Sequence, residues 1–311
     1  MRILHGLQSY PPELRPSVAA LGAFDGIHLA HAKILDTAVE RARALGLPAV
    51  ACTFDPHPAA VLRPDRAPAP IASLDDNLAR MTEHGLDGVL IVPFTRDFAR
   101  MEALAFVDDV LVRTLGVREV VVGFNHTFGR DARGTAALLR DLGASRGFVA
   151  DVLPPLQVGG ITVSSSAIRD ALREGDVDLA RALLGRPYSV TGTVMRGAGR
   201  GRTLGFPTAN LRPDRPLTLA GGVYAARARW DGQRADAVVN IGYRPTFEEQ
   251  QYWIEAYLFD FAGDLYDRSL TLEFLARIRP EMKFAEVDSL KAQVQTDMKE
   301  AQRLLRAQPA G

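Results

Sequence analysis

A chain of 311 residues predicts two domains of ordinary size, and 47% apolar residues are enough for a core in each. Its 37 lysines and arginines balance 37 aspartates and glutamates, which argues against a dedicated nucleic-acid-binding protein, because such proteins carry a strongly basic domain. Neither an apolar signal core at the N-terminus nor a run of membrane-spanning length is found, so we expect a cytoplasmic protein without a membrane segment.

Short apolar strands alternate with helical patterns in the first half of the chain. The only cysteine, Cys52, lies in one of these strands and is expected to be a small core residue. The alternation predicts right-handed βαβ units and a mostly parallel sheet, which binds ligands at the carboxyl ends of its strands. Strands are predicted over 17–23, 49–54, 88–93 and 117–122, and helices over 31–45, 73–84 and about 101–115.

The first loop at that edge, Gly22–His31, is a glycine-containing turn that leads into a helix. His28 and His31 are three residues apart and therefore share one face of the helix start. Imidazole donors at a helix N-terminus suit a phosphate group. Two alternatives stay open, since the histidines could be zinc ligands together with His57 or ordinary solvated side chains.

Three more loops carry polar or aromatic side chains. Proline on both sides of His57 fixes the loop after the second strand, with a rigid turn as the alternative. The glycine-bounded loop Gly123–Gly129 follows the fourth strand, and its Asn125 suits a ribose, base or phosphate. Ser164–Ser166 open a helix whose first turn holds Arg169, where a cation opposes the helix dipole unless an anion is bound; a plain helix cap is the alternative.

The second half of the chain has a different pattern. A helix over 177–184 ends at Gly185, and Arg186-Pro187 marks the expected boundary between domains 1–185 and 186–311. A final helix over about 287–306 is expected to pack over a barrel. The short strands that predict an antiparallel barrel cover 222–230, 235–241, 252–259 and 270–274.

The stretch GTVMRGAGRGRTLGFPTANL, residues 192–211, combines glycines with arginines. Gly197 and Gly199 allow backbone N–H groups to approach an anion closely, and Arg202 supplies planar donors that suit phosphate. The hydroxyl of Thr208 and the amide of Asn210 suit Mg²⁺ and its phosphate oxygens, because hard cations prefer oxygen ligands. A mobile basic surface loop is the alternative.

This stretch resembles the signature of riboflavin kinases, G-x-V-x-x-G-x-x-x-G-R-x-L-G-x-P-T-A-N. Residues 239–247 resemble the N-I-G-x-R-P-T-F run of the same family, and Glu255 falls where that family places its catalytic glutamate. The resemblance implies that Thr208 and Asn210 hold Mg²⁺ and ATP phosphates, that Glu255 is the general base, and that Arg279 lies beside the flavin. Without the resemblance, Glu255 reads as a solvated strand residue and Arg279 as part of a charged turn.

The four loops of the first half together resemble the FAD synthetase module of bacterial bifunctional riboflavin kinase/FAD synthetases, over about residues 15–185. Ala30 stands where the H-x-G-H motif has its glycine, and His126 stands where the G-x-[N/D]-aromatic-x-F-G loop has an aromatic residue. The resemblance implies that His28 and His31 are catalytic. It further implies that ATP is bound by Gly22, Phe24, Asn125, Ser165, Ser166 and Arg169, and the flavin by His57 and Phe128.

The sequence therefore predicts an N-terminal Rossmann-like α/β nucleotidyltransferase domain and a C-terminal antiparallel β-barrel riboflavin kinase domain with a final helix. The expected function is phosphorylation of riboflavin to FMN, followed by adenylylation of FMN to FAD with release of pyrophosphate. ATP, riboflavin and FMN are the expected partners, Mg²⁺ is the cofactor, and no oligomeric state is predicted. Two alternatives stay open: a riboflavin kinase with an altered adenylyltransferase domain, or a flavin or nucleotide sensor without catalysis.

Overall fold

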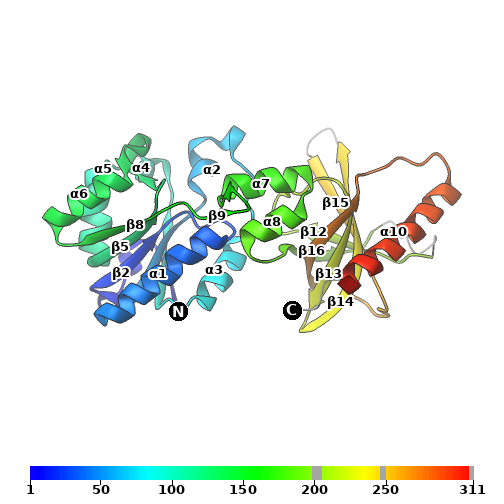
Figure 1. Ribbon diagram of the computed structural model, residues 1–311, viewed down its shortest axis with the longest axis horizontal. Helices are drawn as coiled ribbons and strands as arrows, with labels where there is room; N and C mark the ends of the chain where they lie inside the picture. Colours follow the sequence, from blue (N-terminus) through cyan, green and yellow to red (C-terminus); the bar gives the residue numbers. More distant parts are fainter. Residues whose placement is uncertain (198–204, 246–249, 308–311) are drawn as a thin grey trace. The chain divides into compact units, whose positions relative to one another are not determined.

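The computed structural model describes residues 1–197, 205–245 and 250–307. The chain forms two compact units, which are described separately (Figure 1). The first unit consists of Met1–Pro68 and Ser73–Ser164, and the second of Ala69–Ala72 and Ser165–Gly311. The boundary predicted between domains 1–185 and 186–311 stays a prediction.

The first unit is built on a six-stranded sheet in which every neighbouring pair is parallel, in the order β1-β4-β3-β2-β5-β8. This confirms the predicted parallel sheet, although the two edge strands β1 and β8 were not predicted. The strands are β1 (Arg2–His5), β2 (Ser17–Leu21), β3 (Ala49–Asp55), β4 (Gly88–Pro93), β5 (Val117–Gly123) and β8 (Val149–Leu153).

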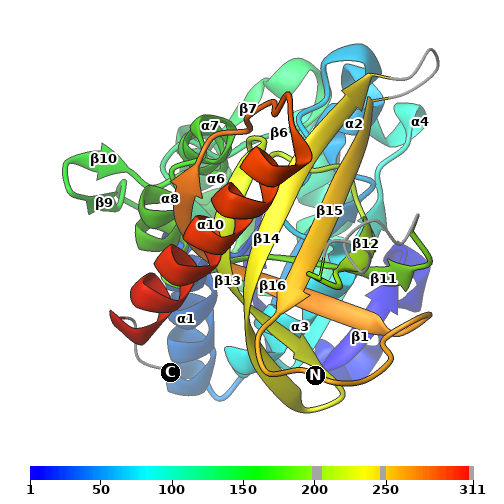
Figure 2. The same cartoon turned by 90° about the vertical axis from the view of Figure 1, so that its right-hand side faces the viewer.

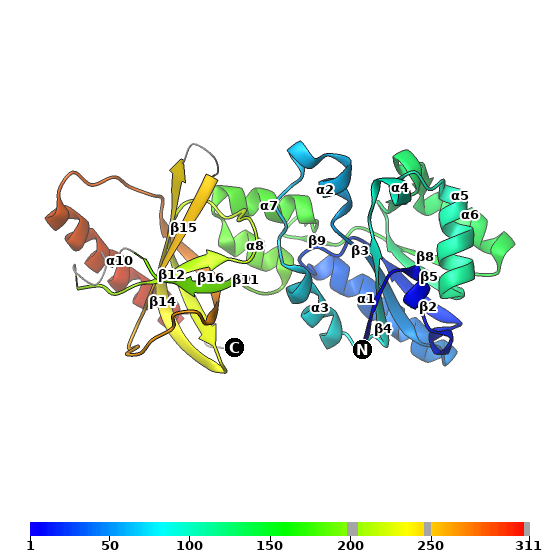
Figure 3. The same ribbon diagram turned by 180° about the vertical axis from the view of Figure 1, so that it is seen from behind.

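Helices cover both faces of this sheet (Figure 3). Val18 and Ala20 of β2 pack with α1 (Leu29–Leu45) and α3 (Leu74–Glu83), whereas Ala19 and Leu21 pack on the other side with the π-helical segment η4 (Phe106–Leu115). Both faces of the central strand are therefore buried, which is why it reads as an unbroken apolar run. The predicted helix over 101–115 is in fact the short α5 (Ala103–Ala105) followed by η4.

Short elements fill the connections of the first unit. They include α2 (Pro58–Leu62), α4 (Arg96–Ala99), α6 (Ala136–Arg146), β6 (Thr127–Phe128) paired with β7 (Gly134–Thr135), and β9 (Gln157–Val158) paired with β10 (Ile161–Thr162). Single 3₁₀ turns, η1 (Leu7–Ser9), η2 (Pro12–Leu14), η3 (Pro64–Arg66) and η5 (Arg130–Ala132), complete them.

A closed six-stranded barrel forms the centre of the second unit, in the order β11-β12-β15-β14-β13-β16 (Figure 2). The strand pairs are antiparallel, and β16 also pairs with β11. The predicted barrel is confirmed, but its first two strands were not predicted. The strands are β11 (Tyr188–Met195), β12 (Ala209–Pro213), β13 (Gly222–Trp230), β14 (Gln233–Pro245), β15 (Gln250–Leu258) and β16 (Ser269–Arg279).

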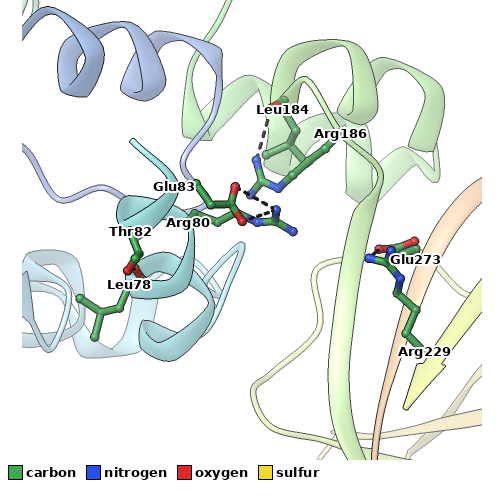
Figure 4. Close-up of polar contacts among 8 residues, drawn as sticks. All are labelled: Leu78, Arg80, Thr82, Glu83, Leu184, Arg186, Arg229 and Glu273. Carbon is green, nitrogen blue, oxygen red and sulfur yellow. Dashed lines mark hydrogen bonds and ion pairs between the residues drawn. The ribbon is translucent and has the colours of Figure 1, made fainter. Parts of the chain in front are cut away.

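Helix α10 (Val287–Ala307) packs across the outer surface of the barrel, against β13, β14 and β16. Ala301 and Leu305 bury the apolar side of the helix against a cluster that includes Val223 and Val238. Polar pairs also link neighbouring barrel strands, as between Arg229 of β13 and Glu273 of β16, whose Nη1 and Oε1 are 2.9 Å apart (Figure 4).

The second unit also contains helices α7 (Ser165–Glu174) and α8 (Val177–Leu184) and the four-residue segment Ala69–Ala72. The buried Arg215 holds this segment, because its Nη2 donates to the carbonyls of both Ile71 and Ser189 at 2.8 Å. A second arginine, Arg169, donates from Nε to the carbonyl of Ala69 at 2.9 Å. None of the helices described by the structure is long and apolar enough to span a bilayer.

Candidate functional sites

The loop between β2 and α1 places two imidazole rings in parallel at a helix start. His28 is the N-cap of α1, and its Nδ1 accepts a hydrogen bond from the backbone N–H of His31 at 3.1 Å. The two rings stack with centroids 3.6 Å apart and planes 16° apart. Both predicted catalytic histidines are therefore next to each other at the N-terminus of a 17-residue helix, where the helix dipole favours an anion.

The capping bond also decides which nitrogen of His28 carries the proton. Because Nδ1 accepts from a backbone N–H, the neutral imidazole of His28 must carry its proton on Nε2. His28 is 4% exposed, so its ring has little freedom to rotate away from the cap. The arrangement provides a fixed Nε2–H donor at the positive end of a helix.

The backbone before His28 adopts conformations that L-residues avoid. Phe24 has φ 43° and Ile27 has φ 35°, and the left-handed region is especially unfavourable for the β-branched Ile27. The buried ring of Phe24 meets His31 edge-on, with centroids 5.2 Å apart. Gly22 lies under the same ring, where an added Cβ would be 3.2 Å from it. Gly22 and Phe24 thus support the histidine pair, and their predicted contact with ATP stays a prediction.

An aromatic cavity of about 520 Å³ lies in the same unit. The ring of Phe128 is one wall, and it lies so close to Gly134 that an added Cβ there would come within 2.6 Å of it. Sequence reasoning missed Gly134, because only its pairing opposite Phe128 on β6 and β7 reveals its role. The other aromatic rings of the wall belong to Phe54, Phe94, Phe98, Phe106 and His126.

His57 and Asn125 lie in loops close to residues that line this cavity. His57 caps α2, and its Nδ1 accepts from the N–H of Ala59 at 3.1 Å; the next residue, Pro58, lines the cavity. Asn125 is exposed in the turn after β5, with its Oδ1 3.5 Å from the position of a Cβ on Gly123. The roles predicted for His57, Asn125 and Phe128 in binding flavin or ATP stay predictions.

Ser165, Ser166 and Arg169 of the serine-rich motif belong to the second compact unit, at the start of α7. Ser165 is half-buried and Ser166 is exposed, while Arg169 is buried and bonded to the carbonyl of Ala69. A backbone carbonyl thus engages Nε of Arg169. The prediction that these three residues bind phosphate together with the histidines stays a prediction.

On the barrel, the strand register sets three polar side chains in one row. Glu255 of β15 lies directly opposite Asn210 of β12 and, on its other side, opposite Asn240 of β14. Residues directly opposite each other in antiparallel strands share a face and have Cβ atoms about 4.5–5.5 Å apart. The flanking Ile254 and Ala256 are buried, so the predicted alternation is confirmed and the half-buried Glu255 lies on the outer face.

Asn210 is held in a narrow space beside the glycine that follows β11. A Cβ on Gly197 would lie 2.2 Å from Nδ2 and 2.8 Å from Oδ1 of Asn210. Oδ1 is buried and makes no hydrogen bond within the described residues, so it is an oxygen available to a ligand. Thr208 is half-buried just before β12, whereas Gly199 and Arg202 lie outside the described residues.

Substitution of Gly197 by alanine is expected to displace the amide of Asn210, because the new methyl group cannot occupy the same space. We expect FMN formation to fall about tenfold or more, with little change in the melting temperature. Kinetics at varied ATP and metal concentrations measure the effect, and Gly205→Ala near the same loop tests backbone strain, since its φ is 90° but its Cβ position is open. Unchanged kinetics for Gly197→Ala would show that the close contact has no role.

Arg279 lies in the same cross-strand row, opposite Val223 on β13. Its guanidinium makes a two-pronged ion pair with the buried Asp297 of α10, with N–O distances of 2.7–3.0 Å, and Gln293 donates to the same carboxylate at 2.9 Å. This pair ties α10 to the barrel and orients Arg279. The flavin contact predicted for Arg279 stays a prediction.

The alternative of a zinc site at His28, His31 and His57 lacks support from the geometry. Within residues 1–197, 205–245 and 250–307, no group of three or more His, Cys, Asp or Glu side chains is arranged to hold a metal ion. Thr208 and Asn210 are not among these four residue types, and their oxygen atoms suit a hard cation rather than zinc.

Two family models match the chain in succession. The FAD synthetase model matches residues 10–167, and the riboflavin kinase model matches residues 184–305. The first therefore covers the histidine pair and the aromatic cavity, and the second covers the barrel with Asn210 and Glu255.

Similar proteins cover nearly the full length of the chain. Bifunctional riboflavin kinase/FMN adenylyltransferases from Pseudomonas fluorescens and Bacillus subtilis are 39% and 38% identical, and the alignments cover 98% and 97% of this chain and 98% and 96% of theirs. A crystal structure described as a macrolide-efflux protein from Streptococcus pneumoniae is 31% identical, with a TM-score of 0.88 over 97% of this chain and 99% of that one.

Proposed function

The chain belongs to the family of bifunctional riboflavin kinases/FMN adenylyltransferases, and we propose that its two reactions take place at two separate sites, one built on the barrel and one on the parallel sheet. The enzyme phosphorylates riboflavin to FMN and adenylylates FMN to FAD. The main support for two sites is the row Asn210–Glu255–Asn240 on the barrel. This row supplies the kinase reaction with a carboxylate of its own, in a different unit of the chain from the histidine pair.

At the barrel site, Glu255 accepts the proton of the terminal ribityl hydroxyl of riboflavin as that oxygen attacks the γ-phosphate of ATP. The new bond joins the ribityl oxygen to phosphorus, and the bond from the γ-phosphate to the β-phosphate oxygen breaks, which releases ADP. Phosphoryl transfer depends mainly on positioning and charge stabilisation. The pairing of Glu255 with Asn210 on one side and Asn240 on the other supports this role, because it fixes the strand that carries the carboxylate.

Enzymes of this family use ATP with a divalent metal ion, and the residues present fit Mg²⁺. The buried Oδ1 of Asn210, which has no hydrogen bond within the described residues, is the kind of hard oxygen that Mg²⁺ prefers. Thr208, two residues earlier, would supply a hydroxyl oxygen beside it. When bound, the ion neutralises charge on the phosphates of ATP.

At the site on the parallel sheet, an oxygen of the FMN phosphate attacks the α-phosphate of a second ATP, and pyrophosphate leaves. The FMN phosphate is already an anion, so the reaction needs charge stabilisation rather than a base. His28 donates from Nε2 to the transferring phosphate, and the ring of His31 stacks on the ring of His28 at the helix N-terminus. The strained loop of Phe24 and Ile27 supports this assignment, because strain of this kind gathers at functional sites.

We place the isoalloxazine ring of FMN in the aromatic cavity of the same unit. A volume of about 520 Å³ with a wall of phenylalanine rings suits a flat, largely apolar ring system. Phe128 would contact the flavin, as predicted, with Gly134 leaving room for its ring. ATP would then bind near Asn125, which directly precedes the cavity residue His126 in the chain.

The proposal is tested by following the flavins formed from riboflavin with excess ATP and Mg²⁺. FMN is expected to rise without a lag, and FAD only after FMN has accumulated, because one reaction supplies the substrate of the other. FMN without FAD would show an inactive adenylyltransferase and would point to the altered positions Ala30 and His126. Riboflavin that is bound but unchanged would instead indicate a sensor, and FAD appearing without a lag would contradict release of FMN between two sites.

A further inference from the structure

His126 introduces a polar group into a cavity whose other rings are phenylalanines. It ends the turn after β5, where its N–H donates to the carbonyl of Gly123 at 3.0 Å. Its ring lies almost parallel to that of Phe128, with planes 24° apart and centroids 5.9 Å apart. The backbone turn and the neighbouring ring together hold the imidazole in the cavity wall.

The Nε2 atom of this imidazole is shielded from solvent and makes no hydrogen bond to the residues that the structure describes. All residues that line the cavity are described by the structure, and among their side chains His126 Nε2 is the buried polar atom that lacks a partner. Burying such an atom without a hydrogen bond is unfavourable, and buried polar atoms in folded proteins are nearly always paired. A ligand in the cavity would supply the missing partner.

The other polar groups of the cavity wall are not hydrogen-bonded to His126 Nε2, so a ligand can bind to this atom. Arg63 and Asp131 are its charged side chains, and Asp131 already faces Arg130 and Arg133 at 3.6 and 4.0 Å. Cys52 also lines the cavity, where burial raises the pKa of its thiol to about 12. Burial lowers the pKa of His126 to about 4, so its imidazole is neutral near pH 7 and offers one donor and one acceptor nitrogen.

We propose that His126 binds and orients the flavin in the adenylyltransferase reaction, by a hydrogen bond from its Nε2 to the polar, pyrimidine-like edge of the isoalloxazine ring. The inference rests on the placement of FMN in this cavity. The phenylalanine rings bind the apolar part of the flavin, and one directional bond to its edge fixes the orientation of the ring. A correctly oriented ring also fixes where the phosphate of FMN lies relative to the histidine pair.

The test compares His126→Phe with His126→Gln in the full-length protein, with FMN and ATP supplied. Phenylalanine keeps the ring but removes the nitrogen, so KM for FMN is expected to rise about tenfold, the loss typical of one hydrogen bond to a buried group. Glutamine retains a donor and an acceptor and is expected to recover part of that loss. KM for ATP should change less than twofold, and thermal unfolding checks the fold.

Two further measurements separate this inference from the placement of FMN. Phe128→Ala should raise KM for FMN if the flavin binds in the cavity at all. A rise with Phe128→Ala but an unchanged or lower KM with His126→Phe would overturn the role of His126 alone, whereas no change in either variant would overturn the cavity as the flavin site. The FMN phosphate itself titrates at about pH 6, so the pH dependence of KM for FMN from about pH 5.5 to 8 is compared between wild type and His126→Phe. The two profiles should have the same shape, and an inflection present only in the wild type would contradict a neutral, buried His126.

Discussion

Glutamine in place of Glu255 is expected to lower the rate of FMN formation by about 10²–10⁴-fold, the usual contribution of a positioned general base. Glutamine has the same shape as glutamate and keeps the strand pairing with Asn210 and Asn240, but its amide cannot accept the proton of the ribityl hydroxyl. The loss should therefore appear in kcat at saturating riboflavin and ATP. Chromatography of the flavins at early times measures it.

The barrel offers a matched control for this substitution. Glu273 is also a strand glutamate on the barrel, and it pairs with Arg229 rather than with the proposed site, so Glu273→Gln should leave FMN formation within about twofold. FAD formation from supplied FMN should survive in both variants. If Glu255→Gln lowered both reactions equally with the fold intact, the division into two independent sites would be wrong.

Asparagine in place of His28 should lower FAD formation from supplied FMN by about 10²–10³-fold, as expected for loss of one donor that stabilises transition-state charge. Asparagine is itself a good N-cap, so the start of α1 keeps its capping hydrogen bond. The distal Nε2–H donor is lost, because the asparagine side chain is shorter than imidazole. Single-turnover measurements with saturating FMN and ATP separate this loss from weaker binding.

Comparison with His28→Ala separates catalysis from capping. Alanine removes the cap as well and should additionally lower the stability of the protein by about 0.5–2 kcal/mol. We expect the two variants to have similarly low FAD formation but different melting temperatures. If His28→Asn formed FAD normally and only His28→Ala did not, the residue would be a helix cap with no part in the reaction.

Much of this architecture could be predicted from local sequence patterns. The strands β4 and β13 and the helix α8 begin and end where predicted. β4 is an apolar run, β13 ends at the Asp231-Gly232 turn, and α8 ends at Gly185. The alternation in β15 correctly placed Glu255 on the face opposite Ile254 and Ala256. Motif order along the chain identified both halves of the enzyme.

The missed features depend on residues that are far apart in sequence. β12 contains only five residues and follows a glycine- and arginine-rich stretch, so its strand conformation comes from pairing with β11 and β15. In the same way, nothing local distinguishes Gly197 from the neighbouring glycines until the amide of Asn210 is placed against it. The motif around Phe24 likewise does not reveal that its ring is buried against His31, and its predicted contact with ATP stays a prediction.

The segment Ala69–Ala72 is synthesised long before the part of the second unit that binds it. Ile71 leaves the ribosome 144 residues before Arg215, whose guanidinium binds its carbonyl. At about 5–20 residues per second, roughly 7–30 s pass before Arg215 is synthesised. A truncated chain that starts after Ser164 would lack the segment entirely, and Nη2 of Arg215 would lose one of its two carbonyl acceptors. The riboflavin-phosphorylating half is therefore harder to excise than its position along the chain suggests.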